Sequence, residues 1–350
     1  MDVTLKQQAQ TIRLPITQRK KIFFGTLLVF LSLVVSIAVL EMALRLLYRE
    51  EQATGDYFGI GGFIQDDEVG YRHAPGFKGY IHRHDVFDCP VAISSNGLRQ
   101  SNFDAQMQYS RRLLILGDSF AFGVGVPEDS IFATLIQHAL NPAGIGVING
   151  GQSGYGTTQE AKFGIRLAQI VKPEMIVLSL FSNNDVSGDY YKDYENVEMR
   201  YGQRLSKNRW LPIAPLDFIR ARAYSWMLLE AALKRKTIEE QRAAFFSLAK
   251  DSTEQVMQPT LNAIKALRDF CQNNKVKLGI MMIQSVTGKT LFDEPLQKAF
   301  SEEGIPVLDL GERKFGRKNY FRGDAHWNAS GHQRAAKQLA PFCMKLLDNT

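Results

Sequence analysis

The residues most able to do chemistry begin with a serine that follows a short apolar run. Residues 113–116 are apolar and end at Gly117, and Ser119 stands two positions later. Such a run predicts a buried strand of a parallel sheet, and the residues just beyond that strand lie at the edge where open α/β sheets bind ligands. Ser119 is therefore a candidate nucleophile. A helix cap is the alternative role for an isolated serine here.

Three further groups of residues follow in the chain. Gly154 lies in a glycine-rich turn after a second apolar run, Asn184 follows a third, and Asp324 and His326 precede the last helical stretch. Acyl transfer needs a nucleophile, a base, a group that orients the base, and donors for the oxyanion. His326 fits the base and Asp324 the orienting acid. The backbone N–H groups of Ser119 and Gly154 and the side-chain amide of Asn184 would be the oxyanion donors.

Over residues 111–348 this pattern resembles the SGNH (GDSL-type) hydrolase superfamily. Ser119, Gly154, Asn184 and His326 match the four residues after which the superfamily is named. The resemblance implies an α/β fold, a flavodoxin-like α/β/α sandwich with a parallel sheet of about five strands. It also implies esterase, lipase or acyl-transfer activity, and we expect no cofactor and no metal.

Two positions depart from the superfamily pattern. Asn183 stands where a glycine usually precedes the asparagine, and Asp324 is separated from His326 by one residue instead of two. The shortened Asp-x-His-Trp sequence is similar to that of membrane-associated SGNH proteins in bacterial exopolysaccharide O-acetylation. The chain is therefore expected to be a membrane-anchored bacterial member of the superfamily.

The rest of the chain predicts the elements that would position these residues. Buried strands are expected at 113–116, 146–148, 175–180, 277–283 and 305–308, and helices near 130–140, 158–171, 259–273, 291–303 and from 328 onward. This alternation is typical of a parallel sheet covered on both faces. We expect a β-rich lead-in over 49–110 and the hydrolase domain over 111–350, with a helical insertion at about 186–255.

The N-terminal part of the sequence predicts a membrane anchor. Residues 1–21 form a basic tail, and residues 22–40 carry no charge. A helix over these 19 residues would be long enough to cross a hydrocarbon core of roughly 30 Å. We expect a transmembrane helix with an interfacial extension over 22–48. A cleaved signal peptide is the alternative, but Glu41 stands where small residues should mark the cleavage site. The basic tail predicts a cytoplasmic N-terminus and a periplasmic catalytic domain in a bacterial inner membrane.

The distribution of charge argues against a nucleic-acid-binding protein, and the spacing of the cysteines and histidines argues against a metal site. The formal net charge is +6, and residues 1–21 contribute +4 of it, so the other 329 residues carry only +2. Nucleic-acid binding therefore loses its main support. The three cysteines lack metal-ligand spacing and are expected to be buried thiols, although one disulfide stays open. His82 and His84 share a predicted strand face but have no third ligand.

The sequence therefore predicts a serine esterase that acts on O-acyl groups, foremost O-acetyl, of an extracytoplasmic polysaccharide or glycoconjugate. A polysaccharide O-acetyltransferase would use the same residues. A lipase or lysophospholipase and a catalytically inactive glycan-binding subunit are the further alternatives. The expected partners are an acylated glycan or lipid substrate, the membrane, and polysaccharide-export or acetylation machinery.

Overall fold

A computed structural model describes residues 17–48, 57–58, 61–311 and 315–348. The chain divides into two compact units, Met1–Tyr48 and Arg49–Thr350. Most of the basic tail and the first residues of the lead-in lie outside the described residues.

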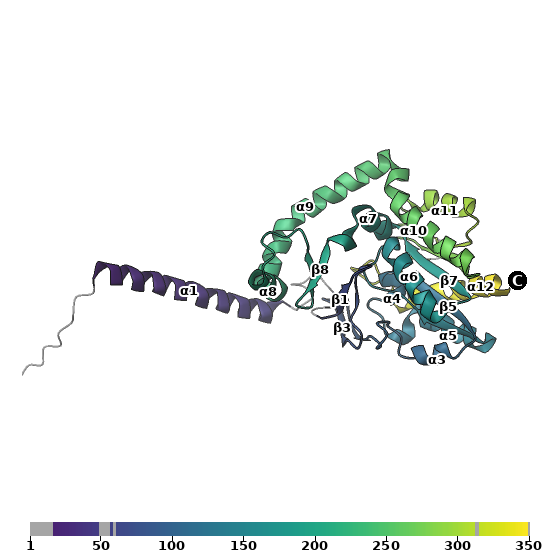
Figure 1. The fold of residues 1–350 in the computed structure, drawn as a ribbon, viewed down its shortest axis with the longest axis horizontal. Coiled ribbons are helices and arrows are strands. Elements are labelled where there is room, and N and C mark those ends of the chain that lie inside the picture. The colour runs from purple at the N-terminus through teal and green to yellow at the C-terminus, as the bar shows by residue number, and fades with distance from the viewer. Residues whose placement is uncertain (1–16, 49–56, 59–60, 312–314, 349–350) are drawn as a thin grey trace, which may run out of the picture. The chain divides into compact units, whose positions relative to one another are not determined.

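The first unit contains one long helix, α1 (Gln18–Leu47), drawn in purple in Figure 1. It is long and apolar enough to cross a membrane, and none of its residues is buried. The helix expected over 22–48 is therefore present. That it crosses a membrane stays a prediction.

The centre of the second unit is a five-stranded parallel sheet with the spatial order β6-β5-β7-β10-β11. The strands are β5 (Arg111–Gly117), β6 (Ile145–Asn149), β7 (Met175–Phe181), β10 (Lys277–Ile283) and β11 (Val307–Asp309). Numbered along the chain, this order is 2-1-3-4-5, the flavodoxin-like doubly wound arrangement. The expected fold class is confirmed. In such sheets the ligand crevice lies beyond the carboxyl ends of the strands where the order reverses, here between β5 and β7.

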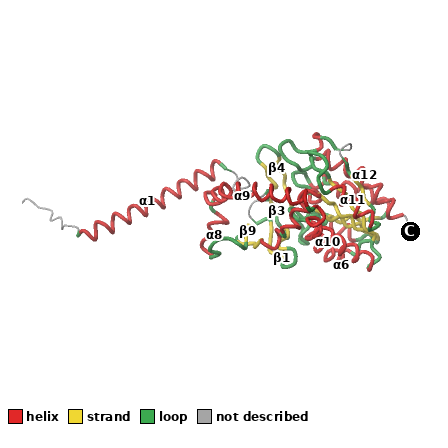
Figure 2. Tube along the Cα trace, turned by 90° about the horizontal axis from the view of Figure 1, so that it is seen from above, coloured by secondary structure: helices red, strands yellow, loops and turns green. Residues whose placement is uncertain are grey.

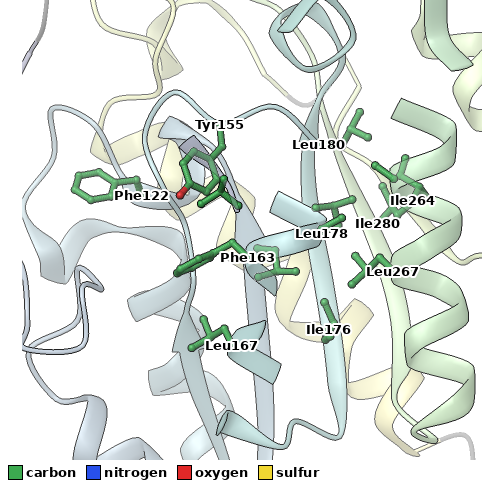
Figure 3. Close-up of a cluster of buried hydrophobic side chains, with 14 of the residues drawn as sticks. Phe122, Tyr155, Phe163, Leu167, Ile176, Leu178, Leu180, Ile264, Leu267 and Ile280 are labelled. Carbon is green, nitrogen blue, oxygen red and sulfur yellow. The ribbon is translucent and has the colours of Figure 1, made fainter. Parts of the chain in front are cut away.

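Helices cover both faces of this sheet. They are α5 (Phe132–Leu140) and α12 (Ala329–Asp348) on one face, and α6 (Thr157–Val171), α10 (Thr253–Asn273) and α11 (Asp293–Glu302) on the other. Successive residues of β5 alternate between the faces: Leu113 and Ile115 pack with α5 and α12, whereas Leu114 and Leu116 pack with α6 and α10. Figure 3 shows the second of these cores, where Leu178 of β7 faces Leu267 of α10. Burial on both faces explains why the strands are continuous apolar runs.

The lead-in forms two antiparallel hairpins and a short helix. The hairpins pair β1 (Phe63–Asp66) with β2 (Gly70–His73) and β3 (Lys78–Arg83) with β4 (Phe87–Ala92), and the helix is α3 (Phe103–Met107). Side chains from this segment, such as Phe58 and Ile81, are buried in the same core as the sheet. The lead-in is therefore an integral part of the second unit.

The insertion is not wholly helical, which corrects the sequence-based expectation. After α7 (Ser182–Tyr191) the chain forms an antiparallel hairpin, β8 (Val197–Arg200) and β9 (Gln203–Ser206), and only then α8 (Ala214–Arg222) and α9 (Tyr224–Asp251). Tyr201 and Gly202 at the hairpin turn both have positive φ, as tight two-residue hairpin loops require. Helix α9 extends from α8 to α10 as a long arm (Figures 1 and 2).

Candidate active site

Ser119 begins the short helix α4 (Ser119–Phe122), directly after β5. Asp118 caps this helix by accepting a hydrogen bond from the backbone N–H of Phe120 at 2.9 Å. Gly117, with φ +152°, makes the turn possible, since a Cβ there would lie 2.9 Å from Cβ atoms of α4 and β7. The first N–H groups of a helix have no intrahelical acceptor, so the Ser119 N–H is free to face a ligand. A strand end and a tight turn thus present the hydroxyl and the N–H of Ser119 together.

His326 and Asp324 complete a hydrogen-bonded chain that begins at Ser119. Nε2 of His326 lies 2.8 Å from Oγ of Ser119, and Nδ1 lies 2.6 Å from Oδ1 of Asp324. The same Oδ1 accepts the backbone N–H of His326 at 2.7 Å. The one-residue spacing between Asp324 and His326 therefore allows the acid to hold both the ring and the backbone of the base. This is the geometry of a Ser-His-Asp triad.

The loop that carries His326 is fixed by its neighbours. Trp327 is 1% exposed, and its ring meets Phe120 edge-on with centroids 4.9 Å apart. Asn328 donates through its side-chain amide to the carbonyl of Tyr320 at 2.9 Å. The Asp-x-His-Trp sequence is thus explained locally, because the tryptophan inserts into the core and holds the preceding histidine toward α4.

The second carboxylate oxygen of Asp324 is bound by two residues of the lead-in. Tyr57 donates its hydroxyl to Oδ2 at 3.1 Å, and Arg83 also donates to this oxygen. Burial raises the pKa of Asp324. The hydrogen bonds and charge of His326, together with the charge of Arg83, lower it by a larger amount, so the pKa of Asp324 lies well below its usual range. Burial and the nearby carboxylate raise the pKa of Tyr57 to about 12. Asp324 is therefore ionised and Tyr57 a hydrogen-bond donor at neutral pH.

Sequence reasoning did not find Tyr57 and Arg83. They are separated from Asp324 by 267 and 241 positions, and no local pattern marks either residue. Only the fold of the lead-in, with Arg83 at the end of β3, brings them to the triad.

Gly154 lies in the turn between β6 and α6 and has φ +79°. Its carbonyl accepts the hydroxyl of Tyr71 at 2.6 Å, and a Cβ on Gly154 would meet that hydroxyl oxygen at 2.9 Å. Among the hydrogen bonds of the described residues, none uses the N–H of Gly154. Its conformation and crowding both require glycine, and its role as an oxyanion donor stays a prediction.

Asn184 lies in the first turn of α7, directly beyond β7. Its amide nitrogen donates to Oδ2 of Asp118 at 2.9 Å. This hydrogen bond joins the segments that follow β5 and β7, the two strands between which the strand order reverses. One N–H of the amide remains for a ligand. Desolvation raises the pKa of Asp118, against the lowering effect of its hydrogen bonds.

Further carboxyl groups are buried behind Asn184. Asp185 accepts the backbone N–H of Phe181 at 2.9 Å, and Glu160 of α6 is 1% exposed. Burial, together with repulsion from neighbouring carboxylates such as Asp118, raises the pKa values of Asp185 and Glu160 well above their usual range. A raised pKa favours the neutral form of each acid, which lowers the cost of burying them together.

A pocket of about 500 Å³ adjoins Asn184. One wall is α7 with the turn that follows it, and the other belongs to α9 of the insertion. The lining combines amide, charged and aromatic side chains, namely Asn183, Asn184, Ser187, Tyr191, Asp193, Asn196, Gln241, Arg242, Phe245 and Phe246. The insertion therefore contributes directly to a cavity beside the candidate oxyanion donor.

The remaining candidate ligands do not form a metal centre within the described part of the chain. No cluster of three His, Cys, Asp or Glu residues with metal-binding geometry occurs there. His82 instead lies 3.3 Å from Asp88 on the paired strand. Cys89, Cys271 and Cys343 are buried free thiols.

No family model matches the chain, and no curated protein matches it. Solved structures with a similar fold include the esterase EstA from Pseudoalteromonas sp. (12% identity, TM-score 0.44, 69% of this chain and 100% of that chain). A lipase/acylhydrolase from Enterococcus faecalis (13%, 0.39, 67% and 96%) and a family 3 carbohydrate esterase from Clostridium thermocellum (12%, 0.38, 68% and 96%) are also similar. Such likeness concerns the fold, and the chemistry of this chain depends on its own side chains.

Proposed function

We propose that this protein is a serine esterase of the SGNH type that removes O-acyl groups, foremost O-acetyl, from a polysaccharide or glycoconjugate. The observation that carries the proposal is the hydrogen-bonded chain from Ser119 through His326 to Asp324, with separations of 2.8 and 2.6 Å. A serine that is only a helix cap has no need of a histidine and a buried, ionised carboxylate in line behind it.

The geometry supports a two-step acyl transfer. Oγ of Ser119 attacks the ester carbonyl carbon while His326 takes its proton through Nε2, and Asp324 stabilises the imidazolium. The tetrahedral oxyanion accepts hydrogen bonds from the N–H groups of Ser119 and Gly154 and from the amide of Asn184. Collapse breaks the ester C–O bond, and the leaving alkoxide receives the proton from His326. Water, deprotonated by His326, then attacks the acyl carbon. The bond from that carbon to Oγ of Ser119 breaks, the acid leaves, and Oγ regains its proton from His326.

The pocket beside Asn184 supports a glycan as the group that carries the ester. Amide side chains such as Asn183 and Gln241 can bind hydroxyl groups, and the rings of Tyr191 and Phe245 can pack against sugar faces. A long acyl chain would favour a lining that is almost wholly apolar. The mixture of polar and aromatic residues therefore favours a short acyl group on a sugar over a lipid substrate.

The helix α1 supports a membrane-anchored enzyme. Lys20 and Lys21 precede its apolar stretch, which is the charge distribution of a cytoplasmic N-terminus. The catalytic unit would then lie in the periplasm of a bacterium. A periplasm-active reporter fused after residue 350 should be active, and activity of a cytoplasmic reporter instead would contradict this orientation.

Purified full-length protein in detergent, wild type and Ser119→Ala, tests the activity. It is incubated with p-nitrophenyl acetate, p-nitrophenyl decanoate and acetylated xylo- and manno-oligosaccharides. We expect Ser119-dependent release of acetate from the oligosaccharides and little hydrolysis of the decanoate. Preference for the decanoate would favour a lipase, and no Ser119-dependent turnover of any ester would contradict the proposal.

The same assay separates hydrolysis from transfer. An O-acetyltransferase has the same triad but hands the acyl group to a sugar hydroxyl instead of water. Non-acetylated oligosaccharide is therefore added with p-nitrophenyl acetate as donor, and acetylated product is measured by mass spectrometry. We expect free acetate to exceed acetylated sugar, and the reverse ratio would identify a transferase.

A further inference from the structure

The insertion carries a cluster of apolar side chains that are exposed on its surface. Residues 210–215, Trp-Leu-Pro-Ile-Ala-Pro, are all exposed, and so are Phe218 and Ile219 of α8 and Leu229 and Leu233 of α9. Trp210 is 75% exposed and Leu233 70% exposed. We name this set, residues 210–215 with Phe218, Ile219, Leu229 and Leu233, the insertion face. Trp210, Leu229 and Leu233 share one surface pocket of about 360 Å³, so the loop and α9 form a continuous part of it.

Charged residues lie buried directly beneath this face. The side chains of Arg209, Asp217 and Arg220 are 6%, 0% and 5% exposed. Arg209 pairs with Asp217 at 2.6 Å, and Arg220 pairs with it at 3.0 Å. The hydrogen bonds of Arg209 lower the pKa of Asp217 to about 2. The usual polarity of a water-facing surface is thus inverted, with ion pairs inside and apolar side chains outside.

The ion pairs also hold the exposed loop in place. Arg220 donates to the backbone carbonyls of Trp210 and Leu211, the latter at 2.9 Å. The exposed indole is therefore carried by a braced loop. Holding apolar side chains outward in this way is useful where a non-aqueous phase covers them.

The charge around the face identifies that phase. Apart from the three buried charges, residues 207–240 contain five Lys and Arg against three Asp and Glu, a net charge of +2. Exposed Lys207 and Arg222 flank the loop and α8. Tryptophan, phenylalanine and leucine bordered by Lys and Arg are typical of segments that lie in the interface of an anionic bilayer.

We propose that the insertion face docks on the anionic surface of the membrane in which α1 is anchored. The inference rests on the proposed membrane anchor. Only eight residues, 49–56, connect Tyr48 to Tyr57, and a chain of this length extends at most about 30 Å. Such a link keeps the second unit near the bilayer, where docking costs little further entropy. The wall of the candidate substrate pocket formed by α9 would then be held at the membrane.

Tryptophan quenching in the full-length protein tests this proposal. The protein is reconstituted into nanodiscs of phosphatidylcholine and phosphatidylglycerol with either plain or brominated acyl chains. Interfacial segments bury their apolar face about 5–10 Å deep, so we expect bromine to quench the emission of Trp210 by roughly half or more. Trp226 lines the same surface pocket as Trp210, so both proteins compared carry Trp226→Phe. In that background Trp210→Phe should lose this quenching, because the remaining tryptophan, Trp327, is buried in the core.

Two further variants keep the test decisive. Phe218→Trp in the background that carries both Trp210→Phe and Trp226→Phe puts a second reporter on α8, and it should be quenched as well. Ile170→Trp in the same background is the matched control, since Ile170 is 63% exposed on α6, away from the insertion. Incorporation into nanodiscs without quenching at 210 and 218, or equal quenching at 170, would overturn docking. Failure to incorporate would overturn the anchor and docking together, and neither result depends on esterase activity.

Discussion

The two carboxylate oxygens of Asp324 contact two different regions of the molecule, the edge of the parallel sheet and the lead-in. Oδ1 contacts His326, whose partner Ser119 stands at the end of β5. Oδ2 contacts Tyr57 and Arg83, which come from the irregular lead-in. The sheet edge therefore supplies the candidate nucleophile, and the lead-in supplies two further hydrogen bonds that hold the acid in place.

This difference separates what the reaction needs from what tunes it. A parallel sheet fixes its strand ends to one edge, so residues such as Ser119 and Asn184 are close whatever else the chain does. The lead-in contributes through hydrogen bonds to a carboxylate that His326 already orients. Substitutions at the sheet edge and the triad should therefore have large effects on the rate, and those in the lead-in small ones.

Among substitutions in these two regions, Asp324→Asn should lower kcat the most. The amide would favour the wrong tautomer of His326 and could not stabilise its cation, and a loss in kcat of about 10⁴-fold is typical of this change. The measurement is kcat for p-nitrophenyl acetate, with circular dichroism to show that the fold is retained. A loss below tenfold in a folded variant would mean that Asp324 is not the orienting acid.

Asn184→Ala should come next, with a loss in kcat of about 10²–10³-fold, because one oxyanion donor is removed. Asn183→Ala is the matched control, since this neighbour lines the same pocket. It should change mainly KM. Equal losses in kcat for the two variants would contradict a specific role for the Asn184 amide.

Tyr57→Phe should lower kcat/KM by about tenfold, the order of a hydrogen bond to a charged group. The ring and its packing are kept, so only the hydroxyl at 3.1 Å from Asp324 is lost. Tyr80→Phe on the exposed side of β3 serves as the control and should leave the kinetics unchanged. A Tyr57→Phe enzyme with wild-type kinetics would show that the lead-in does not act on Asp324 through this residue.

Arg83→Ala should have the smallest effect, up to about fivefold in kcat/KM at neutral pH, because a partly exposed ion pair contributes about 0.2–1 kcal/mol. The charge of Arg83 lowers the pKa of Asp324, so its removal raises that pKa. Loss of this positive charge also makes the hydrogen-bonded Asp324–His326 pair as a whole easier to protonate. The acidic limb of the pH–rate profile should therefore move to higher pH. Arg83→Lys keeps the charge and should restore the wild-type limb, and identical limbs in all three proteins would exclude this electrostatic role.

The parts of the fold and site that the sequence predicts are those with local signals. Each strand of the sheet is an apolar run, and Ser119 and Asn184 directly follow two of them. The β8–β9 hairpin was missed because its strands are short and polar, although Gly202 at the turn was an available signal. The contacts of Tyr57 and Arg83 depend on tertiary packing across more than 240 positions, which no local pattern contains.

Covalent labelling can identify the nucleophile itself. Full-length wild type, Ser119→Ala and Ser153→Ala are treated with a fluorophosphonate and digested for mass spectrometry. Ser153 is the matched control, because it lies in the turn beside Gly154 and its N–H is already bonded to His73. We predict one phosphonyl adduct, on Ser119, present in wild type and Ser153→Ala and absent in Ser119→Ala. An adduct that persists in Ser119→Ala, or a wild type that takes none, would contradict Ser119 as the nucleophile.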